Sequence, residues 1–455
     1  MNFIRKKSLQ SDRDLLEEQK NKLIDNLGST EEVLAYAGKV SNSFVNSWVS
    51  IFRMDELDSV LSEIGSKISS SSHSINNKPE VLHLCTGYFQ TGGHSSVIDC
   101  CLQDKSVSQL TVITNNAERE SEEPELCESI CLDSESSLTS RISILKGIIE
   151  SVNPTYIILH IHPSDVIAIS AISSLKLENC RIIFFNQSDH TFSLGYSFAD
   201  SIVHFREFGH FFSQKYRDGA GNAVVALPFS SNNPNSEEKF NFFNQQRNHF
   251  QTISVGATWK FCGDGEINFF KTMSKILSKN QSILHFHVSD LTARQIIALK
   301  LRWNLGSRFK FLSLGREKTR KLIGSSDLLI DSAPVGGGMV RNDSISASTP
   351  FIHWQNRNAP IISRSSNWDE RYSTIYEDEE SLIRQINTLS NDSERYSQLY
   401  EEVRELRKTL IKKRSFLNEI LNPEKLDSNL MVEVIHDEEY FHSLRSNRNL
   451  ISLLR

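Results

Sequence analysis

The first 64 residues carry apolar side chains at helical spacing. The stretch Ser11–Glu18 begins with a residue type that favours helix N-caps and continues with acidic side chains, as the first turn of a helix commonly does. Apolar residues then recur every three or four positions, which is the period of one helix face. Residues 65–80 interrupt this pattern because they are polar and rich in serine. The pattern predicts a helical N-terminal segment over residues 1–64, followed by a connector.

Beyond residue 80, short apolar runs alternate with amphipathic stretches. Near-continuous apolar strands separated by helices are typical of a parallel sheet that is covered on both faces. The alternation predicts a Rossmann-like domain over residues 80–228. Its expected strands are Val81–Cys85, Leu110–Thr114, Tyr156–His160, Arg181–Phe185 and Ser201–His204, with Ala223–Leu227 as a candidate sixth.

The alternation stops at Pro228, where a segment rich in Pro, Asn and Ser extends to about residue 250 and marks a domain boundary. It then restarts over residues 250–422. The expected strands of this second Rossmann-like domain are Ile253–Val255, Ile283–His287, Phe309–Leu312, Leu328–Ile330 and Phe351–Trp354. Two consecutive doubly wound α/β units predict a ligand cleft between them.

The chain ends with further helical pattern. Residues 391–421 are predicted as one long charged helix, and residues 423–455 as a helical tail that could cross back onto the first domain.

Composition narrows the class of protein. The net charge of −6 gives no overall attraction to nucleic acid, and no apolar run approaches the roughly 20 residues that span a bilayer. The N-terminus lacks the apolar region of a signal peptide, so we expect a cytoplasmic protein. The seven cysteines show no zinc spacing. Cys127 and Cys131 would share one face of a helix, but reduced core thiols are favoured and no metal is expected.

The strongest motif lies within residues 326–352. Asp331 directly follows the predicted strand Leu328–Ile330, and Gly336, Gly337 and Gly338 come just before a predicted helix. Glycines let backbone N–H groups approach a ligand closely, and a helix N-terminus carries partial positive charge, which together favour a diphosphate. The alternative is a turn whose glycines only make room for packing.

This motif resembles the donor-binding segment of GT-B glycosyltransferases, which also runs from a strand ending in Asp through a glycine turn and a helix to Thr-Pro. The resemblance implies a nucleotide-sugar donor bound mainly by the second half of the chain. Asp343 stands where that family often carries a Glu that contacts the donor's ribose or sugar. Arg341 replaces a usually small residue and could pair with a phosphate.

Two more segments of the second half fit the same resemblance. In such enzymes the loop after the first strand of this domain often carries a Lys or Arg that neutralises the leaving diphosphate, which nominates Lys260. The alternative is an ordinary loop lysine. Arg316 follows the Leu312–Gly315 loop, which stands where the family often encloses the nucleotide base.

The first half contains a strand, a glycine-rich loop and a helix start over residues 83–97. The loop is not a dinucleotide-binding fingerprint, but its residues Gly92, Gly93 and His94 resemble a loop that faces the acceptor in many GT-B enzymes. At a helix N-terminus the dipole disfavours the imidazolium, so His94 would be a neutral base. A surface histidine without a role is the alternative.

Asp189 and His190 follow another predicted strand of the first half, within a motif that resembles one in a set of bacterial glycosyltransferases. A carboxylate beside an imidazole can deprotonate an acceptor hydroxyl. Because adjacent side chains often point apart, the two residues could also act separately. His160 and His162, at the end of the preceding strand, could line the same site.

These resemblances imply a two-domain GT-B enzyme that moves a sugar from a nucleotide-sugar donor to a hydroxyl of a glycan, a lipid-linked molecule or a protein, in surface glycan or glycoconjugate synthesis, without a metal. Nucleic acid is not an expected partner, and peripheral association with the inner membrane face stays open. The alternatives are a nucleotide-sugar epimerase, a phosphorylase, and a non-catalytic GT-B-like module that binds a glycan or a protein partner. The sequence leaves open the nucleotide, the sugar, the stereochemical course and the oligomeric state.

Overall fold

The computed structural model describes residue 18 and residues 28–47, 52–75, 78–89, 93–115, 127–189, 191–205, 207–217, 222–224, 248–261, 267–333, 336–354, 374–411 and 415–422. The chain divides into two compact units. The first consists of Met1–Ala226 and Ser415–Val432, and the second of Leu227–Arg414 and Glu433–Arg455.

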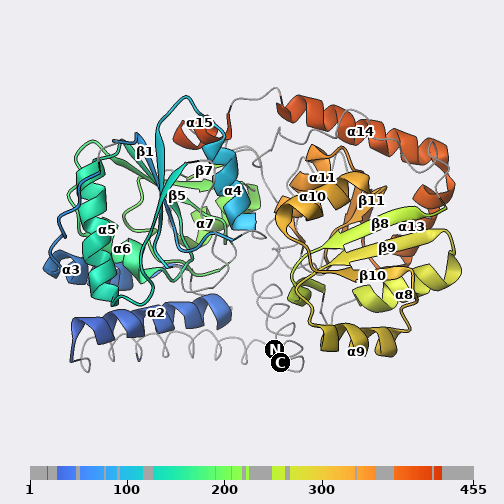
Figure 1. The fold of residues 1–455 in the computed structure, drawn as a ribbon, viewed down its shortest axis with the longest axis horizontal. Coiled ribbons are helices and arrows are strands. Elements are labelled where there is room, and N and C mark those ends of the chain that lie inside the picture. Colours follow the sequence, from blue (N-terminus) through green and yellow to red (C-terminus); the bar gives the residue numbers. More distant parts are fainter. Residues whose placement is uncertain are drawn as a thin grey trace. The chain divides into compact units, whose positions relative to one another are not determined.

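The first unit contains a sheet of seven parallel strands in the order β3-β2-β1-β4-β5-β6-β7 (Figure 1). Its central strands are buried along nearly their whole length, as expected for a sheet covered on both faces. The strands are β1 (Val81–Cys85), β2 (Gln109–Ile113), β3 (Glu128–Cys131), β4 (Tyr156–His160), β5 (Arg181–Phe185), β6 (Ser201–His204) and β7 (Asn222–Val224).

Helices pack on this sheet and complete its core. They are α2 (Thr30–Ser47), α3 (Asp55–Lys67), α4 (Gly93–Leu102), α5 (Leu138–Val152), α6 (Val166–Ser173), α7 (Glu207–Arg217) and α15 (Phe416–Leu421). Leu34 and Leu61, on α2 and α3, are completely buried in the same apolar cluster as the sheet. A Cβ on Gly65 of α3 would lie 1.9 Å from the carbonyl oxygen of Ser170 on α6, so only glycine permits this close packing. The described part of the predicted N-terminal segment is therefore integral to the first unit.

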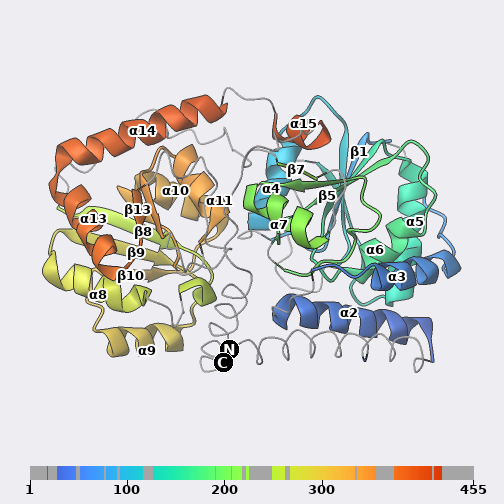
Figure 2. The same ribbon diagram turned by 180° about the vertical axis from the view of Figure 1, so that it is seen from behind.

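The second unit contains six parallel strands in the order β10-β9-β8-β11-β12-β13 (Figures 1 and 2). The strands are β8 (Phe250–Val255), β9 (Ile283–Val288), β10 (Phe309–Leu312), β11 (Leu328–Ile330), β12 (Phe351–Trp354) and β13 (Thr374–Tyr376). The helical elements are the 3₁₀ turn η2 (Thr258–Phe261), α8 (Phe269–Lys279), α9 (Ala293–Trp303), α10 (Arg316–Ser325), α11 (Gly338–Ser346), α13 (Glu379–Asn391) and α14 (Ser393–Ile411).

The structure departs from the sequence prediction mostly at sheet edges. The edge strands β3 and β13 were not predicted, since each is short and lacks a continuous apolar run. Cys131 lies in β3, so the expectation that it shares a helical face with Cys127 was wrong. The long helix predicted over residues 391–421 is two helices, α14 and α15.

Helix α15 also belongs to a different unit from the one predicted. The second domain was expected to extend to residue 422, but α15 packs on α4 of the first unit. The Phe416 ring meets the Phe185 ring edge-on with 5.9 Å between their centroids, and Arg181 Nη1 donates to the Leu421 carbonyl at 3.3 Å.

Among the described residues, no helix is long and apolar enough to cross a membrane.

Each sheet has one topological switch point. β1 lies between β2 and β4, so the connections after β1 and after β4 run toward opposite edges of the first sheet. β8 lies between β9 and β11, so the same holds for the connections after β8 and β11. In open α/β sheets, ligands bind beyond the carboxyl ends of the strands at such a point. The loops after β1 and β4, and after β8 and β11, are therefore the places to look for a functional site.

Candidate functional site

In the second unit, Lys260 lies on η2, directly after β8. A neighbouring loop holds this turn, because Asp290, just beyond β9, accepts hydrogen bonds from Thr258 N at 2.7 Å and Thr258 Oγ1 at 2.6 Å. Burial opposes ionisation of Asp290, but these hydrogen bonds keep its pKa below the ordinary value. The next residue of the turn, Phe261, is anchored in the core. Lys260 is half-buried and is presented by a fixed turn.

The glycine turn after β11 is organised by a buried carboxylate. Asp331 Oδ1 accepts hydrogen bonds from Ser332 N at 2.8 Å and Gly337 N at 3.0 Å. Gly337 is the N-cap of α11, and its amide is occupied by this bond to Asp331. The first three amides of the helix belong to Gly338, Met339 and Val340. Because no helical carbonyl lies four positions before them, these N–H groups have no acceptor within the helix. Their N–H groups and the helix dipole favour an anion at this end of α11.

Arg341 is placed against the same carboxylate. Its Nε lies 3.3 Å from Asp331 Oδ2, and the two side chains are 3% and 2% exposed. Arg341, which was predicted to contact a phosphate, therefore contacts Asp331 through its Nε. It stabilises the carboxylate that holds the glycine turn. Gly336 is half-buried at the start of this turn.

Asp343 links two helices that begin at this edge of the sheet. Arg320 Nε on α10 donates to Asp343 Oδ1 at 2.9 Å, and the side chain of Asp343 is 14% exposed. Burial raises the pKa of Asp343, while the charges of Arg320 and Arg316 act in the opposite direction. Arg316, at the first position of α10, is half-buried and lies close enough to influence Asp343. The structure thus brings Arg316 and Asp343 together.

In the first unit, His94 lies in the first turn of α4. Its Nε2 donates a hydrogen bond to the carbonyl oxygen of His160, which can only accept, so in the neutral ring Nδ1 carries the lone pair. Burial lowers the pKa of His94 to about 4, the bond to His160 partly opposes this, and the nearby His162 lowers the pKa further. The imidazole is thus neutral near pH 7, as expected from the sequence, although burial is the main cause.

Asp165 is a polar centre that the sequence analysis missed. Its Oδ2 accepts from Thr86 Oγ1 at 2.6 Å and Thr114 Oγ1 at 2.5 Å, and its Oδ1 caps α6 through the amides of Ile167 and Ala168. The loops that follow β1, β2 and β4 are thereby tied together. A Ser-Asp pair directly before an apolar helical run is an N-cap signal, and it would have marked this residue.

Asp189 is buried after β5 and packs closely against α7. A Cβ on Gly209 would lie 2.5 Å from Asp189 Oδ2. Arg217, itself 1% exposed, donates to the carbonyl oxygens of Asp189 (2.9 Å) and Thr191. These are the residues on either side of position 190. His190 and Gly92 lie outside the described residues, while Gly93 is exposed at the start of α4.

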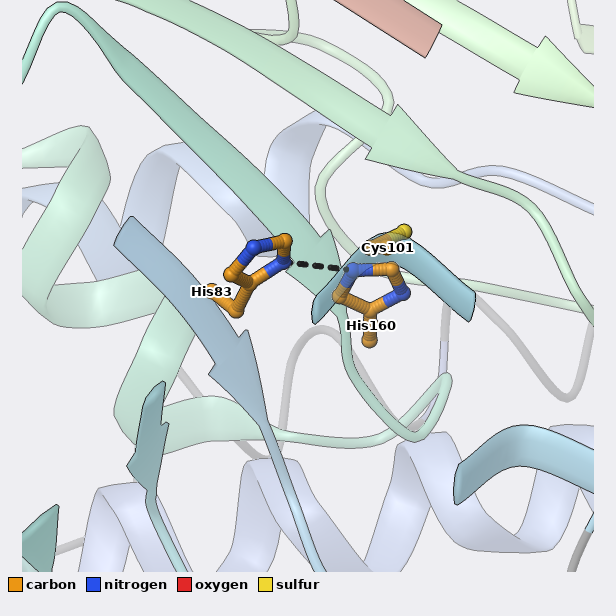
Figure 3. Close-up of side chains that lie close together, drawn as sticks. All are labelled: His83, Cys101 and His160. Carbon is orange, nitrogen blue, oxygen red and sulfur yellow. Dashed lines mark hydrogen bonds between the residues drawn. The ribbon is translucent and has the colours of Figure 1, made fainter. Parts of the chain in front are cut away.

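A buried histidine pair is formed by His83 on β1 and His160 on β4 (Figure 3). Gln109 Nε2 donates to the Asp104 carbonyl, which turns its Oε1 toward His83 Nε2 at 2.8 Å. Neutral His83 therefore accepts at Nδ1, and His160 Nε2 donates to it across 3.1 Å. In the described part of the chain, His83, His160 and Cys101 form the one group whose potential metal-ligand atoms lie within 4.8 Å of one another. The hydrogen bond between His160 Nε2 and His83 Nδ1 is sufficient to explain the 3.1 Å between these two nitrogen atoms.

Comparison with known proteins finds similarity in structure alone. No protein-family model matches the sequence. No curated protein matches it either. The solved structure of HepE from Anabaena with UDP and glucose is similar over 75% of this chain and 97% of its own, with 14% identity and a TM-score of 0.54.

Two other solved structures show the same likeness. A mutant O-GlcNAc transferase from Thermobaculum terrenum is similar over 95% of this chain and 82% of its own, with 9% identity and a TM-score of 0.53. WaaG, a glycosyltransferase involved in lipopolysaccharide biosynthesis, is similar over 75% of this chain and all of its own, with 13% identity and a TM-score of 0.53. With its two Rossmann-like parallel sheets, the chain has the GT-B fold of these glycosyltransferases.

Proposed function

We propose that this protein is a glycosyltransferase that moves a sugar from a nucleoside diphosphate sugar to an acceptor hydroxyl. The observation that carries the proposal lies in the second unit, where two loops at the β8/β11 switch point offer groups that favour an anion. One presents Lys260 on a turn fixed by Asp290, and the other presents the N-terminus of α11 on a turn fixed by Asp331. HepE, which shares the fold, was solved with UDP-glucose.

In this proposal the second unit stabilises the leaving group. The amides of Gly338, Met339 and Val340 and the ammonium of Lys260 would receive the negative charge that develops on the diphosphate. Arg316 and Asp343 would contact the nucleoside or the sugar. Arg341 would act indirectly, through the buried carboxylate of Asp331.

The first unit would supply the base. The acceptor oxygen forms a bond to the anomeric carbon as the bond from that carbon to the diphosphate oxygen breaks, and the proton of the acceptor passes to an imidazole. His190 is the first candidate, with Asp189 orienting it, and His94 Nδ1 is the second, since Gly92, Gly93 and His94 form the proposed acceptor-side loop. Direct displacement assisted by a base inverts the anomeric centre. No metal takes part in this scheme.

The test is a panel of UDP, GDP, CMP and dTDP sugars. Thermal shift identifies the nucleotide that binds, and hydrolysis and transfer assays with that donor show whether the sugar moves. We expect one nucleotide class to stabilise the protein and to support release of the nucleoside diphosphate. Binding without turnover on any acceptor would instead favour a non-catalytic GT-B-like module, and interconversion of the sugar without transfer would favour an epimerase.

The cellular role follows from the same proposal. The acceptor would be a glycan, a lipid-linked molecule or a protein in surface glycan or glycoconjugate synthesis, and the reaction would take place in the cytoplasm, where nucleotide sugars are available.

A further inference from the structure

Helix α9 of the second unit differs from the other described helices in what it exposes. Ile297 and Leu301 are 59% and 80% exposed, and within the described residues they are the large apolar side chains that stand out into solvent. They are four positions apart and therefore lie on one face of the helix. No residue of α9 is fully buried, and Ile296, Leu299 and Trp303 make its partly buried contact with the core. Figures 1 and 2 show α9 at the margin of this unit, beside α8.

Basic side chains flank the exposed apolar face on both sides. At about 100° per residue, Leu301 lies near the centre of the face, Lys300 about 100° to one side and Arg302 about 100° to the other. Arg294 extends the outer face by two turns toward the N-terminus of α9. The Arg302 guanidinium lies 4.9 Å from the Trp303 ring, and Lys300 Nζ lies 6.0 Å from the Phe311 ring. These contacts hold the two cations at the edges of the apolar face.

The local charge is opposite to that of the whole protein. Residues 291–310 contain five basic residues and no acidic one, whereas the chain as a whole carries a net charge of −6. Arg308 is occupied by the carbonyl oxygens of Asn280 and Ile283, so it contributes little to the outer surface. Arg294, Lys300, Arg302 and Lys310 are exposed.

We propose that α9 is a membrane-contact surface that lies in the headgroup region of an anionic lipid bilayer. An apolar centre bordered by cations is the arrangement by which a helix inserts aliphatic side chains below the headgroups while its charges remain at their level. The combination selects this partner over others. Nucleic acid would use the cations but gains little from exposed Ile and Leu, and a second copy of the chain would bring the same cations against one another.

This inference concerns a face of the second unit and does not depend on the proposed transfer reaction. Its test is co-sedimentation of the full-length protein with vesicles of phosphatidylcholine alone or with roughly one third phosphatidylglycerol. We expect binding to the anionic vesicles alone, and loss of that binding as salt rises from about 0.05 to 0.5 M. An absence of binding to anionic vesicles at low salt overturns the proposal.

Two double variants separate the apolar and the charged parts of the surface. Ile297→Ser with Leu301→Ser should lower vesicle affinity at least about tenfold, because it removes most of the apolar area that inserts. Lys300→Gln with Arg302→Gln should lower it about 25-fold, at roughly fivefold for each basic side chain near an anionic surface. Arg404→Gln with Lys408→Gln, on exposed positions of α14, is the control that changes the net charge equally and should bind like the unmodified protein.

The same variants distinguish the α9 surface from another membrane-binding surface, from attraction by overall charge, and from a dimer interface. If both α9 variants bind as tightly as the unmodified protein, another part of the chain carries the membrane contact and the proposal fails. If the α14 control loses as much affinity as Lys300→Gln with Arg302→Gln, the attraction is to overall charge and α9 is not the surface. A dimer in light-scattering measurements that Leu301→Ser converts to a monomer, together with no vesicle binding, would assign the face to a second copy.

Discussion

The two switch points of this protein are built from opposite kinds of groups. At β1 and β4 of the first unit, the polar groups are histidines and Asp165. The histidines bond to one another and to a backbone carbonyl, and Asp165 accepts from threonine hydroxyls. At β8 and β11 of the second unit, the groups are the backbone amides at a helix N-terminus and the half-buried Lys260, and the acids Asp290 and Asp331 hold the two turns that carry them.

The difference shows that one strand topology can prepare two kinds of chemistry. Carboxylates behind a turn leave positive groups at its surface, which suits a diphosphate. Buried neutral imidazoles retain a lone pair near pH 7, as a general base requires, but a pKa of about 4 makes His94 a weak base. Each of the following predictions tests one side of this contrast.

The largest effect is expected for His190→Ala. If the first unit supplies the base, turnover should fall roughly 10²–10⁴-fold, which is the usual contribution of general-base catalysis. Donor affinity should hardly change, since the nucleotide is assigned to the second unit. Steady-state kinetics and calorimetric titration measure the two quantities. His94→Ala is the matched control: if it alone slows turnover, the two roles are exchanged, and if neither variant does, the base is wrongly assigned and a retaining mechanism gains support.

Lys260→Ala should give the next largest effect. Removal of one charge that stabilises the leaving group costs about 2–4 kcal/mol of transition-state stabilisation. The value of kcat/KM for transfer reports this loss. Lys275→Ala, an exposed lysine on α8, is a control that should leave the rate unchanged. A Lys260→Ala rate within about threefold of the original would show that Lys260 is an ordinary loop residue.

Gly337→Val should weaken donor binding while the protein stays folded. A Cβ at this position would lie 3.3 Å from Asp331 Oδ1, so the branched side chain would displace the carboxylate that holds the turn. Donor affinity should fall about 100-fold, because hydrogen bonds to a charged group contribute roughly 1.5–3 kcal/mol each. Calorimetric titration with the nucleotide measures it, and an unchanged affinity would remove the turn from the donor site.

Acidification should destabilise both units, and each buried histidine should contribute less than the substitutions above. Burial lowers the pKa of His83 and His94 to about 4 and that of His287 to about 3, all below the value of about 6.5 in the unfolded chain. At pH values between the lowered pKa of each ring and about 6.5, the native state therefore binds fewer protons than the unfolded state. The stability that these neutral rings provide is present above pH 6.5 and is lost as the pH falls toward 4.

Between about pH 7 and pH 5 the free energy of unfolding should fall on the order of 1–2 kcal/mol for each such histidine. Asp58 opposes this trend, because burial raises its pKa to about 6 and its protonated form stabilises the native state at lower pH. Chemical denaturation at the two pH values measures the balance, and His83→Gln should reduce the dependence. An equal free energy of unfolding at both values would contradict the assignment of buried neutral rings.

Much of the fold could be predicted from the apolar pattern. The buried strands β1, β4 and β5 were predicted with their observed bounds, because a continuous apolar run between polar loops has few other interpretations. The glycine turn before α11 was also recognisable, since glycines between a strand and a helix have a specific backbone use. The edge strands β3 and β13 could not be predicted, because neither has a continuous apolar run, whereas the edge strand β10 was predicted with its observed bounds.

The partners of the candidate residues were harder to predict, because they depend on contacts distant in sequence. Arg341 was interpreted as a phosphate ligand from its position next to a glycine turn, and that position gives no sign that its Nε lies 3.3 Å from Asp331, ten positions earlier. Arg217 binds carbonyl groups 26 and 28 positions away. Neither contact could be inferred from the local sequence, because the packing of α7 and α11 on their sheets brings these groups together.

The return of the chain to its first unit has a consequence for synthesis on the ribosome. Helix α15 buries Phe416, Leu417, Ile420 and Leu421, and it belongs to a unit whose other described strands and helices end at Val224. The first unit to emerge is therefore completed late, because Leu227–Arg414 of the second unit has to be translated before α15 can reach α4. Until then the surface that receives Phe416 is open, so nascent chains stalled between residues 226 and 415 should expose an apolar site to chaperones.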